Sequence, residues 1–163
     1  MLSIHKSENT EKNYKTMVTV INDFLKDEKD VIANLANISA IINSYVQNLN
    51  WVGFYILKKD ELVLGPFQGM PACVRIKPNT GICMSCVSSK QIVNVPNVQE
   101  VPNHIACDSA TKSELVAPIF KNGNIYGVLD LDSPMLNRFT KLEEKYILEI
   151  SSLISEFLSN SLS

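Results

Sequence analysis

No apolar run in the sequence approaches the roughly 20 residues that a membrane-spanning helix requires. The start of the chain, MLSIHKSENT, also lacks the apolar central region of a secretory signal peptide. Basic residues are not in excess, because the formal net charge is −2 at pH 7, and nucleic-acid affinity depends on neutralising phosphates. We therefore expect a cytoplasmic protein that binds neither a membrane nor a nucleic acid.

Cysteine is also scarce, since four in 163 residues are too few for a disulfide scaffold. In a reducing compartment, such cysteines more often serve metal binding or thiol chemistry than structural bridging. The hydrophobic fraction of 45% and the charged fraction of 20% are typical of a folded globular protein. The length leaves room for one domain, residues 1–163, in which 1–10 are expected to form a flexible N-terminus.

Three stretches have the apolar spacing of amphipathic helices. The first runs from about Glu11 to Leu25, and the last from about Thr140 to Leu158. Thr140 and Glu143 have the spacing of a capping box, which marks the start of the last helix. The middle helix is expected to carry an apolar stripe made of Ile32, Leu35, Ile38, Ile42 and Tyr45.

Between these helices the period changes to two, which is typical of strands. In WVGFYIL one face would hold Trp51, Gly53 and Tyr55, and the other Val52, Phe54 and Ile56. The remaining central segments are predicted as strands at Leu62–Gly65 and Gln91–Val95, a short helix at Gly81–Ser89, and a loop from Pro96 to Cys107. This order predicts an α+β fold with a mainly antiparallel sheet, helices on one face and a small-ligand pocket on the other.

The clearest hairpin joins SELVAPIF to NIYGVLDLDS through KNG. Patterning favours a three-residue loop with Gly123 left-handed over a two-residue turn, because only the former separates apolar from acidic residues. It gathers the following residues on one apolar face: Leu115, Ala117, Ile119, Ile125, Leu129 and Leu131. On the opposite face it places Glu114 across from Asp130, with Asp132 beside them.

The cysteines admit several interpretations. Cys83 and Cys86 form a CxxC, and His104 and Cys107 form an HxxC, so these four could hold zinc in a Cys₃His site. That interpretation leaves Cys73 and the acids unexplained. Inert buried cysteines are the common alternative, because free cysteine is among the most buried residue types.

Asp130 and Asp132 could simply be solvated, or could start a turn at Ser133 and Pro134. The predicted register instead adds Glu114 beside them, which favours a functional cluster. Like charges held close together raise the pKa of at least one carboxyl, which can then stay protonated and donate a proton. Trp51 and Tyr55 could be ordinary cover for the sheet. Above the acids, they would also form a small box suited to a partly cationic ligand.

Seven motifs resemble, in order and spacing, those of the free methionine-(R)-sulfoxide reductases, which are built on a GAF-type domain. They are WVGFY, LVLGPFQG, PACVRI, the GIC around Cys83, HIACD, SELV with Pro118, and GVLDLDS. The resemblance extends from roughly Leu35 to the last helix. It implies reduction of the R epimer of free methionine sulfoxide, with electrons from thioredoxin, no bound cofactor and a homodimeric assembly.

The resemblance also implies which residues form the site. The family's three cysteines fall on Cys73, Cys83 and Cys107, its pocket aromatics on Trp51 and Tyr55, and its pocket acids on Glu114, Asp130 and Asp132. The chain departs from the family pattern at Met84 and Asn103, where glycine is usual, and at Cys86, where a small residue is usual. These departures affect the Cys83 segment and suggest that the CxxC is incidental.

The chemistry of these residues, combined with the family resemblance, predicts a mechanism. Cys107 would attack the sulfoxide sulfur and become a sulfenic acid, while Glu114 or Asp132 protonates the oxygen. Cys73 or Cys83 would then condense with Cys107, and Cys73 is favoured because its PACVRI segment is unaltered. A non-catalytic GAF-type sensor of a small ligand is the alternative, although such modules usually regulate an attached effector domain.

Overall fold

The computed structural model describes residues 4, 6–104 and 107–161. Its elements, in chain order, are α1 (Thr10–Asp27), α2 (Val31–Tyr45), β1 (Trp51–Lys58), β2 (Glu61–Gly69), β3 (Arg75–Ile76), α3 (Gly81–Ser89), β4 (Val93–Val95), the 3₁₀ helix η1 (Val98–Glu100), β5 (Ser113–Lys121), β6 (Asn124–Ser133) and α4 (Lys141–Asn160). Every helix and strand predicted from the sequence is present. Along this described part of the chain, none of the helices is long and apolar enough to cross a bilayer.

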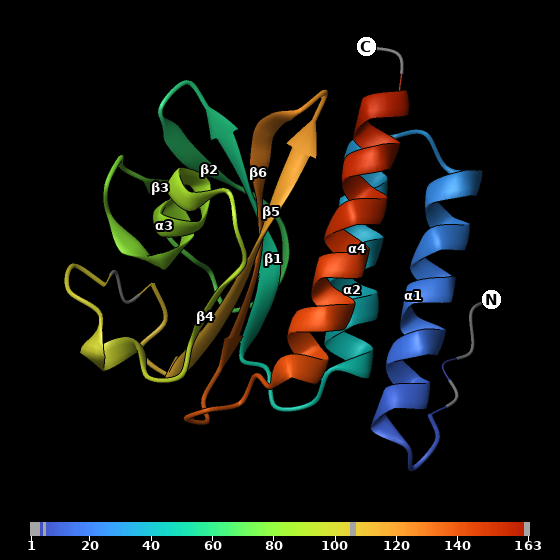
Figure 1. Cartoon of the computed structure of the whole chain (residues 1–163), viewed down its shortest axis with the longest axis horizontal. Coiled ribbons are helices and arrows are strands. Elements are labelled where there is room, and N and C mark those ends of the chain that lie inside the picture. Colours follow the sequence, from blue (N-terminus) through green and yellow to red (C-terminus); the bar gives the residue numbers. More distant parts are fainter. Residues whose placement is uncertain (1–3, 5, 105–106, 162–163) are drawn as a thin grey trace.

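The strands form one six-stranded sheet in the order β3-β2-β1-β6-β5-β4, and every neighbouring pair is antiparallel. Helices α2 and α4 cover one face of the sheet, and α1 lies beyond them, whereas α3 lies on the opposite face (Figure 1). The predicted α+β architecture, with helices gathered on one face, is therefore confirmed.

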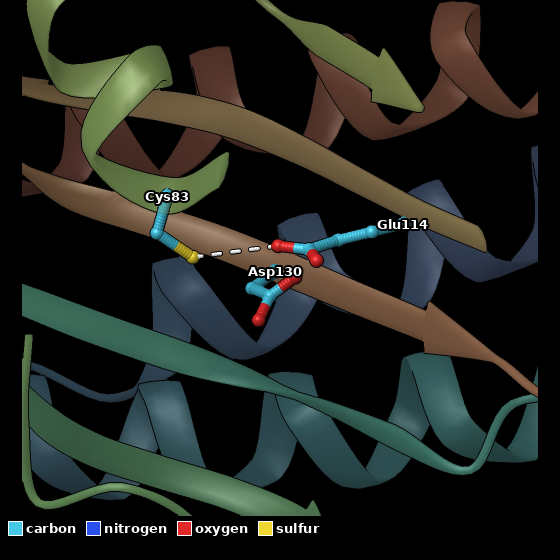
Figure 2. Close-up of side chains that lie close together, drawn as sticks. All are labelled: Cys83, Glu114 and Asp130. Carbon is cyan, nitrogen blue, oxygen red and sulfur yellow. Dashed lines mark hydrogen bonds between the residues drawn. The ribbon is translucent and has the colours of Figure 1, made fainter. Parts of the chain in front are cut away.

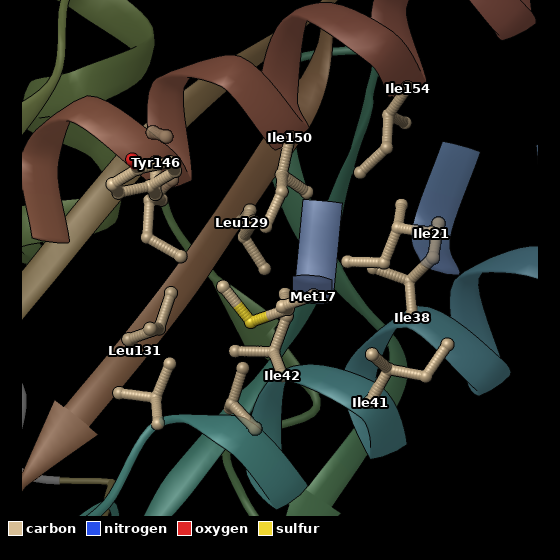
Figure 3. Close-up of a cluster of buried hydrophobic side chains, with 14 of the residues drawn as sticks. Met17, Ile21, Ile38, Ile41, Ile42, Leu129, Leu131, Tyr146, Ile150 and Ile154 are labelled. Atoms are coloured by element: carbon tan, nitrogen blue, oxygen red, sulfur yellow. The ribbon is translucent and has the colours of Figure 1, made fainter. Parts of the chain in front are cut away.

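The main core lies between the sheet and the helices (Figure 3). Among its side chains are Met17 and Ile21 of α1, Ile38 and Ile42 of α2, Leu129 and Leu131 of β6, and Ile150 and Ile154 of α4. The predicted stripe of α2 is correct except at Ile32, which is 71% exposed. Ile32 is the second residue of α2, and Val31 packs against the core instead.

The β5–β6 hairpin corrects one prediction. Lys121 pairs with Asn124, so the connection is a two-residue turn of Asn122 and Gly123, with φ of 50° and 79°. Positive φ at both central residues is the signature of a type I′ turn. A β-bulge follows, because Phe120 pairs with Ile125 but Ile119 pairs with Gly127, which leaves Tyr126 without a partner across the strand pair.

The bulge explains why the predicted faces were nearly right although the predicted turn was wrong. The shorter turn and the extra residue each shift the register by one residue in the same direction. A total shift of two residues preserves the faces, so Leu129 and Leu131 still face the helices. Ile125 was wrongly assigned to that face, where Tyr126 packs instead. Glu114 lies opposite Asp132, not opposite Asp130 as predicted.

The predicted capping box at the start of α4 is also present, and Glu143 links it to the rest of the protein. The Glu143 carboxylate accepts hydrogen bonds from the Thr140 backbone N–H (2.8 Å), the Tyr14 hydroxyl (2.7 Å) and the Arg138 guanidinium (3.0 Å). Burial alone would raise the pKa of Glu143. A hydrogen bond from the Thr140 hydroxyl, together with the three just named, lowers that pKa to about 2.

We expect Glu143→Gln to lower the free energy of unfolding by about 1–3 kcal/mol at pH 7, because hydrogen bonds to a buried charge are lost. The folded-state pKa of Glu143 is lower than its ordinary value of 4.5, so this contribution is complete above pH 4.5 and is lost as the pH falls toward 2. Urea unfolding at pH 7 and at pH 3 measures the difference. Glu149→Gln, on the exposed side of α4, is the control and should change stability little; an equal loss in both variants would contradict the assignment.

Candidate active site

A cavity opens on the sheet face that carries α3. It has a volume of about 510 Å³, counting the part that is open to solvent. Its lining includes seven of the predicted site residues, namely Trp51, Tyr55, Cys83, Cys107, Glu114, Asp130 and Asp132. The eighth, Cys73, does not line the cavity but is bonded to Cys107, which does. One cavity therefore brings together the cysteines, acids and aromatics that lie far apart in the sequence.

The acids reach the cavity because of strand register. Asp132 of β6 lies between Trp51 of β1 and Glu114 of β5, and Asp130 is two residues along the same strand. Side chains two residues apart on a strand share a face, so all three carboxyls project toward α3. Glu114 and Asp130 are only 6% and 5% exposed. The alternative of a solvated turn residue is thus wrong for Asp130.

Burial and proximity keep these carboxyls from ionising easily. Desolvation raises the pKa of Glu114 well above its ordinary value, and the neighbouring Asp130 and Asp132 raise that pKa further. Desolvation, followed by the charges of Asp130 and Asp108, raises the pKa of Asp132 in the same way. Burial raises the pKa of Asp130 to about 7. The cluster can therefore hold at least one protonated carboxyl near neutral pH, or accept a cation.

Cys83 faces the acids from the first turn of α3. Figure 2 shows its sulfur pointing toward the carboxyls of Glu114 and Asp130, with a distance of 3.7 Å from Cys83 Sγ to Glu114 Oε1. Burial and the charge of Asp130 raise the pKa of the Cys83 thiol well above its ordinary value. In this arrangement Cys83 is a neutral thiol that donates to Glu114, and it is a poor nucleophile.

Cys86 has a different environment from Cys83. Its Sγ lies 3.2 Å from the carbonyl oxygen of Gln91 and 3.6 Å from that of Val116, and burial raises its pKa to about 12. The geometry of the Cys₃His alternative is absent within the described residues, because Cys107 is bonded to Cys73 and Cys86 is not part of the cavity lining. The metal-ligating side chains that converge there are Cys83, Glu114 and Asp130.

Aromatic rings form one wall of the cavity. Trp51 stacks between Tyr55 and Phe67, with ring centroids 5.8 Å and 5.3 Å apart. Gly53 makes room for this stack, since a Cβ there would lie 2.3 Å from the Cβ of Phe67. In the described structure Trp51 Nε1 and Asp130 Oδ1 are buried without a hydrogen-bond partner, which is costly unless a ligand or water supplies one.

A disulfide joins Cys73 to Cys107 across 34 residues, with their Cα atoms 5.4 Å apart. The side chains of Tyr55 in β1 and of Asn50, which directly precedes β1, hold the segments that carry these cysteines. The Tyr55 hydroxyl donates to the backbone carbonyl of Cys73 at 2.9 Å. The Asn50 side-chain amide donates to the Asp108 carboxylate at 2.9 Å and to Thr111 Oγ1 at 3.0 Å. The disulfide is thus anchored on both sides to residues at β1.

The sequence analysis missed several of these residues. Phe67 lies in the LVLGPFQG motif but was not assigned to the site, and Asn50 directly precedes Trp51. Asp108 follows Cys107 in HIACD, and this pairing of a loop acid with an amide 58 residues away has no sequence signal. His104 lines the cavity, and burial lowers its pKa. Its Nδ1 is buried and has no hydrogen-bond partner among the described atoms.

Comparisons with known proteins agree with this geometry. The GAF domain family matches residues 17–158. The chain is 42% identical to Protein YtsP of Bacillus subtilis, over 94% of this chain and 96% of that protein. It is 39% identical to the free methionine-R-sulfoxide reductase of Escherichia coli, over 86% of this chain and 85% of that protein. The structure of the free methionine-R-sulfoxide reductase of Neisseria meningitidis, in complex with its substrate, superimposes with a TM-score of 0.93 and 36% identity, covering 99% of this chain and 98% of that one.

Proposed function

We propose that this chain, which belongs to the free methionine-R-sulfoxide reductases of the GAF domain family, reduces the R epimer of free methionine sulfoxide to methionine. The observation that carries the proposal is the Cys73–Cys107 disulfide, because Cys107 lines the same cavity as three acids whose pKa values are raised. A thiol that becomes oxidised beside a proton donor is what sulfoxide reduction needs. A sensor that only binds its ligand would have no use for the disulfide.

The cavity offers a partner for each part of the substrate. The acids would receive the substrate ammonium, and backbone N–H groups would receive its carboxylate. The methyl group on sulfur would rest against Trp51, which lines the cavity beside the acids. Desolvation strengthens the attraction between an ammonium and a carboxylate, so binding the charged substrate would offset part of the cost of burying these acids.

In the proposed reaction, Cys107 attacks the sulfoxide sulfur while a carboxyl protonates the oxygen. Glu114 and Asp132 are the proposed donors, since burial keeps the pKa of both well above the ordinary range. The bond between the substrate sulfur and its oxygen then breaks, the oxygen is transferred to the Cys107 sulfur, and methionine leaves while Cys107 becomes a sulfenic acid. Cys73 then condenses with it, releasing water and forming the disulfide. Cys83 is proposed to support the acids, because its Sγ contacts Glu114 and its pKa is raised.

Thioredoxin is the proposed electron donor, acting in the cytoplasm, and it would return both cysteines to thiols. The electrons then come from thiols alone, so the cycle needs no bound cofactor and no metal. The homodimer implied by the resemblance stays a prediction.

The proposal is tested with free methionine-R-sulfoxide, the S epimer, N-acetylated sulfoxide and a sulfoxide-containing peptide, with dithiothreitol as reductant. Only the free R epimer should be reduced rapidly. Acylation removes the ammonium that the acids are placed to meet, and a buried acid left without its partner is costly. Comparable rates on the peptide would rule out a site for the free amino acid.

For the acids, we expect Glu114→Gln and Asp132→Asn each to lower the rate by roughly two to four orders of magnitude, the usual range for a positioned proton donor. Folding should be preserved, because removing a buried like charge relieves repulsion. In the wild type, activity should decline as the pH rises through the pKa of the donor. Near-normal rates in both variants would mean that neither acid donates the proton.

Single-turnover experiments without reductant separate the roles of the cysteines. Cys107→Ser should release no methionine, because the nucleophile is missing. Cys73→Ser should release up to one methionine per chain and leave a sulfenic acid that dimedone traps. Cys86→Ser is the control and should behave as the wild type. A burst from Cys107→Ser that disappears in Cys83→Ser would instead make Cys83 the nucleophile.

A further inference from the structure

We propose that the segment from Met70 to Val74 is the docking site for the dithiol protein that reduces the Cys73–Cys107 disulfide, and that this protein attacks the sulfur of Cys73. The inference rests on the proposed function, because only a catalytic disulfide has to be reduced after each turnover. It adds where the electron donor binds and which sulfur it attacks.

The segment is apolar and strongly exposed. Met70 is 68% exposed and Val74 is 65% exposed, and Pro71 between them is exposed as well. Among the large hydrophobic residues of the described chain, Ile32 on α2 alone is more exposed. Exposed apolar side chains gathered in one place commonly mark an interaction surface, and methionine is enriched in such surfaces. Here they lie on both sides of a cysteine that must be reached from outside.

The backbone of this region is also suited to docking. Residues 70–74 form neither helix nor strand, and they lead directly into β3. β3 is an edge strand that pairs, within the described chain, with β2 alone. An edge strand presents backbone groups to which an extended segment of another protein can be added, while side-chain contacts supply the specificity. Met70 and Val74 would supply those contacts.

The two sulfurs of the disulfide differ in their surroundings. Cys107 lines the substrate cavity, whereas Cys73 is not part of that lining. A thiolate that approaches over the exposed segment 70–74 therefore meets Cys73 first. The other cysteines cannot be the targets of a partner, because Cys83 is 4% exposed and Cys86 is fully buried.

The reduction then balances in two steps. A thiolate of the donor attacks Cys73 Sγ and breaks the Cys73–Cys107 bond, so that Cys107 leaves as a thiolate and a mixed disulfide forms on Cys73. The second thiolate of the donor attacks the donor sulfur of this mixed disulfide and releases the Cys73 thiolate. The donor ends as a disulfide, and the chain has gained two electrons and takes up two protons.

The docking surface is tested by reducing the oxidised chain, without substrate, using either thioredoxin with its reductase and NADPH or dithiothreitol. Met70→Lys and Val74→Lys should each raise the KM for thioredoxin about tenfold, since a charge is placed in an apolar contact. Their rates with dithiothreitol should stay unchanged. Ile32→Lys, at a residue of similar exposure on the helical side, is the matched control and should alter neither rate.

Unchanged kinetics with thioredoxin in both segment variants would overturn the docking site, as would equal losses with the two reductants. Because this assay contains no sulfoxide, it is independent of the proposed activity. A wild type that thioredoxin reduces but that does not turn over methionine sulfoxide would refute the function and leave the docking surface intact.

The attacked sulfur is identified by trapping. A thioredoxin variant whose second active-site cysteine is replaced by serine stops at the mixed disulfide, and peptide mass spectrometry then shows the bonded residue. We expect a peptide joined to Cys73. A peptide joined to Cys107 would overturn the assignment of the attacked sulfur.

Discussion

The pairing of β6 with its two neighbours is the constraint on which the rest of the structure depends. It places Trp51, Asp132 and Glu114 in one row across three strands on the cavity face. On the other face, the same register buries Leu129 and Leu131 against the helices. A slip of one residue would move the acids into the apolar core and the leucines into the cavity. The large core therefore fixes the position of the acids, although they take no part in it.

Once the acids are fixed there, their burial determines the chemistry. Three carboxyls with little access to water cannot all be charged, so they bind a proton or a cation. The same cavity face holds Cys83 next to Glu114 and is also lined by Trp51. One side of the site is thus the sheet itself, which presents three carboxyls whose pKa values are raised. The disulfide-bonded Cys73 and Cys107 lie on segments that hydrogen bonds from Tyr55 and Asn50 tie to β1 and the residue before it.

Much of the fold could be predicted because periodicity reports which face of an element is buried. The strand period separated Trp51 and Tyr55 from Val52 and Phe54, and the capping box located the start of α4. The turn at Asn122 and Gly123 was predicted wrongly. A short turn followed by a bulge leaves the same alternation as a longer loop, and the two differ only in the exchange of Ile125 for Tyr126 and in the residue opposite Glu114. Ile32 was misassigned because a helix stripe does not show where the core ends.

By itself, the sequence determined the residue types available to the site and the sheet face on which each strand presents them, because alternation is a local property of the chain. It left the choice between Cys73 and Cys83 as the partner of Cys107 almost open. Only the tertiary structure decided it, by joining Cys73 to Cys107 and holding Cys83 against Glu114. It also turned Cys86 toward the carbonyls of Gln91 and Val116, away from any zinc site. The physical reason is that a sulfur–sulfur bond forms only at contact distance. That distance depends on how loops from different strands are anchored over the sheet, which sequence spacing does not encode.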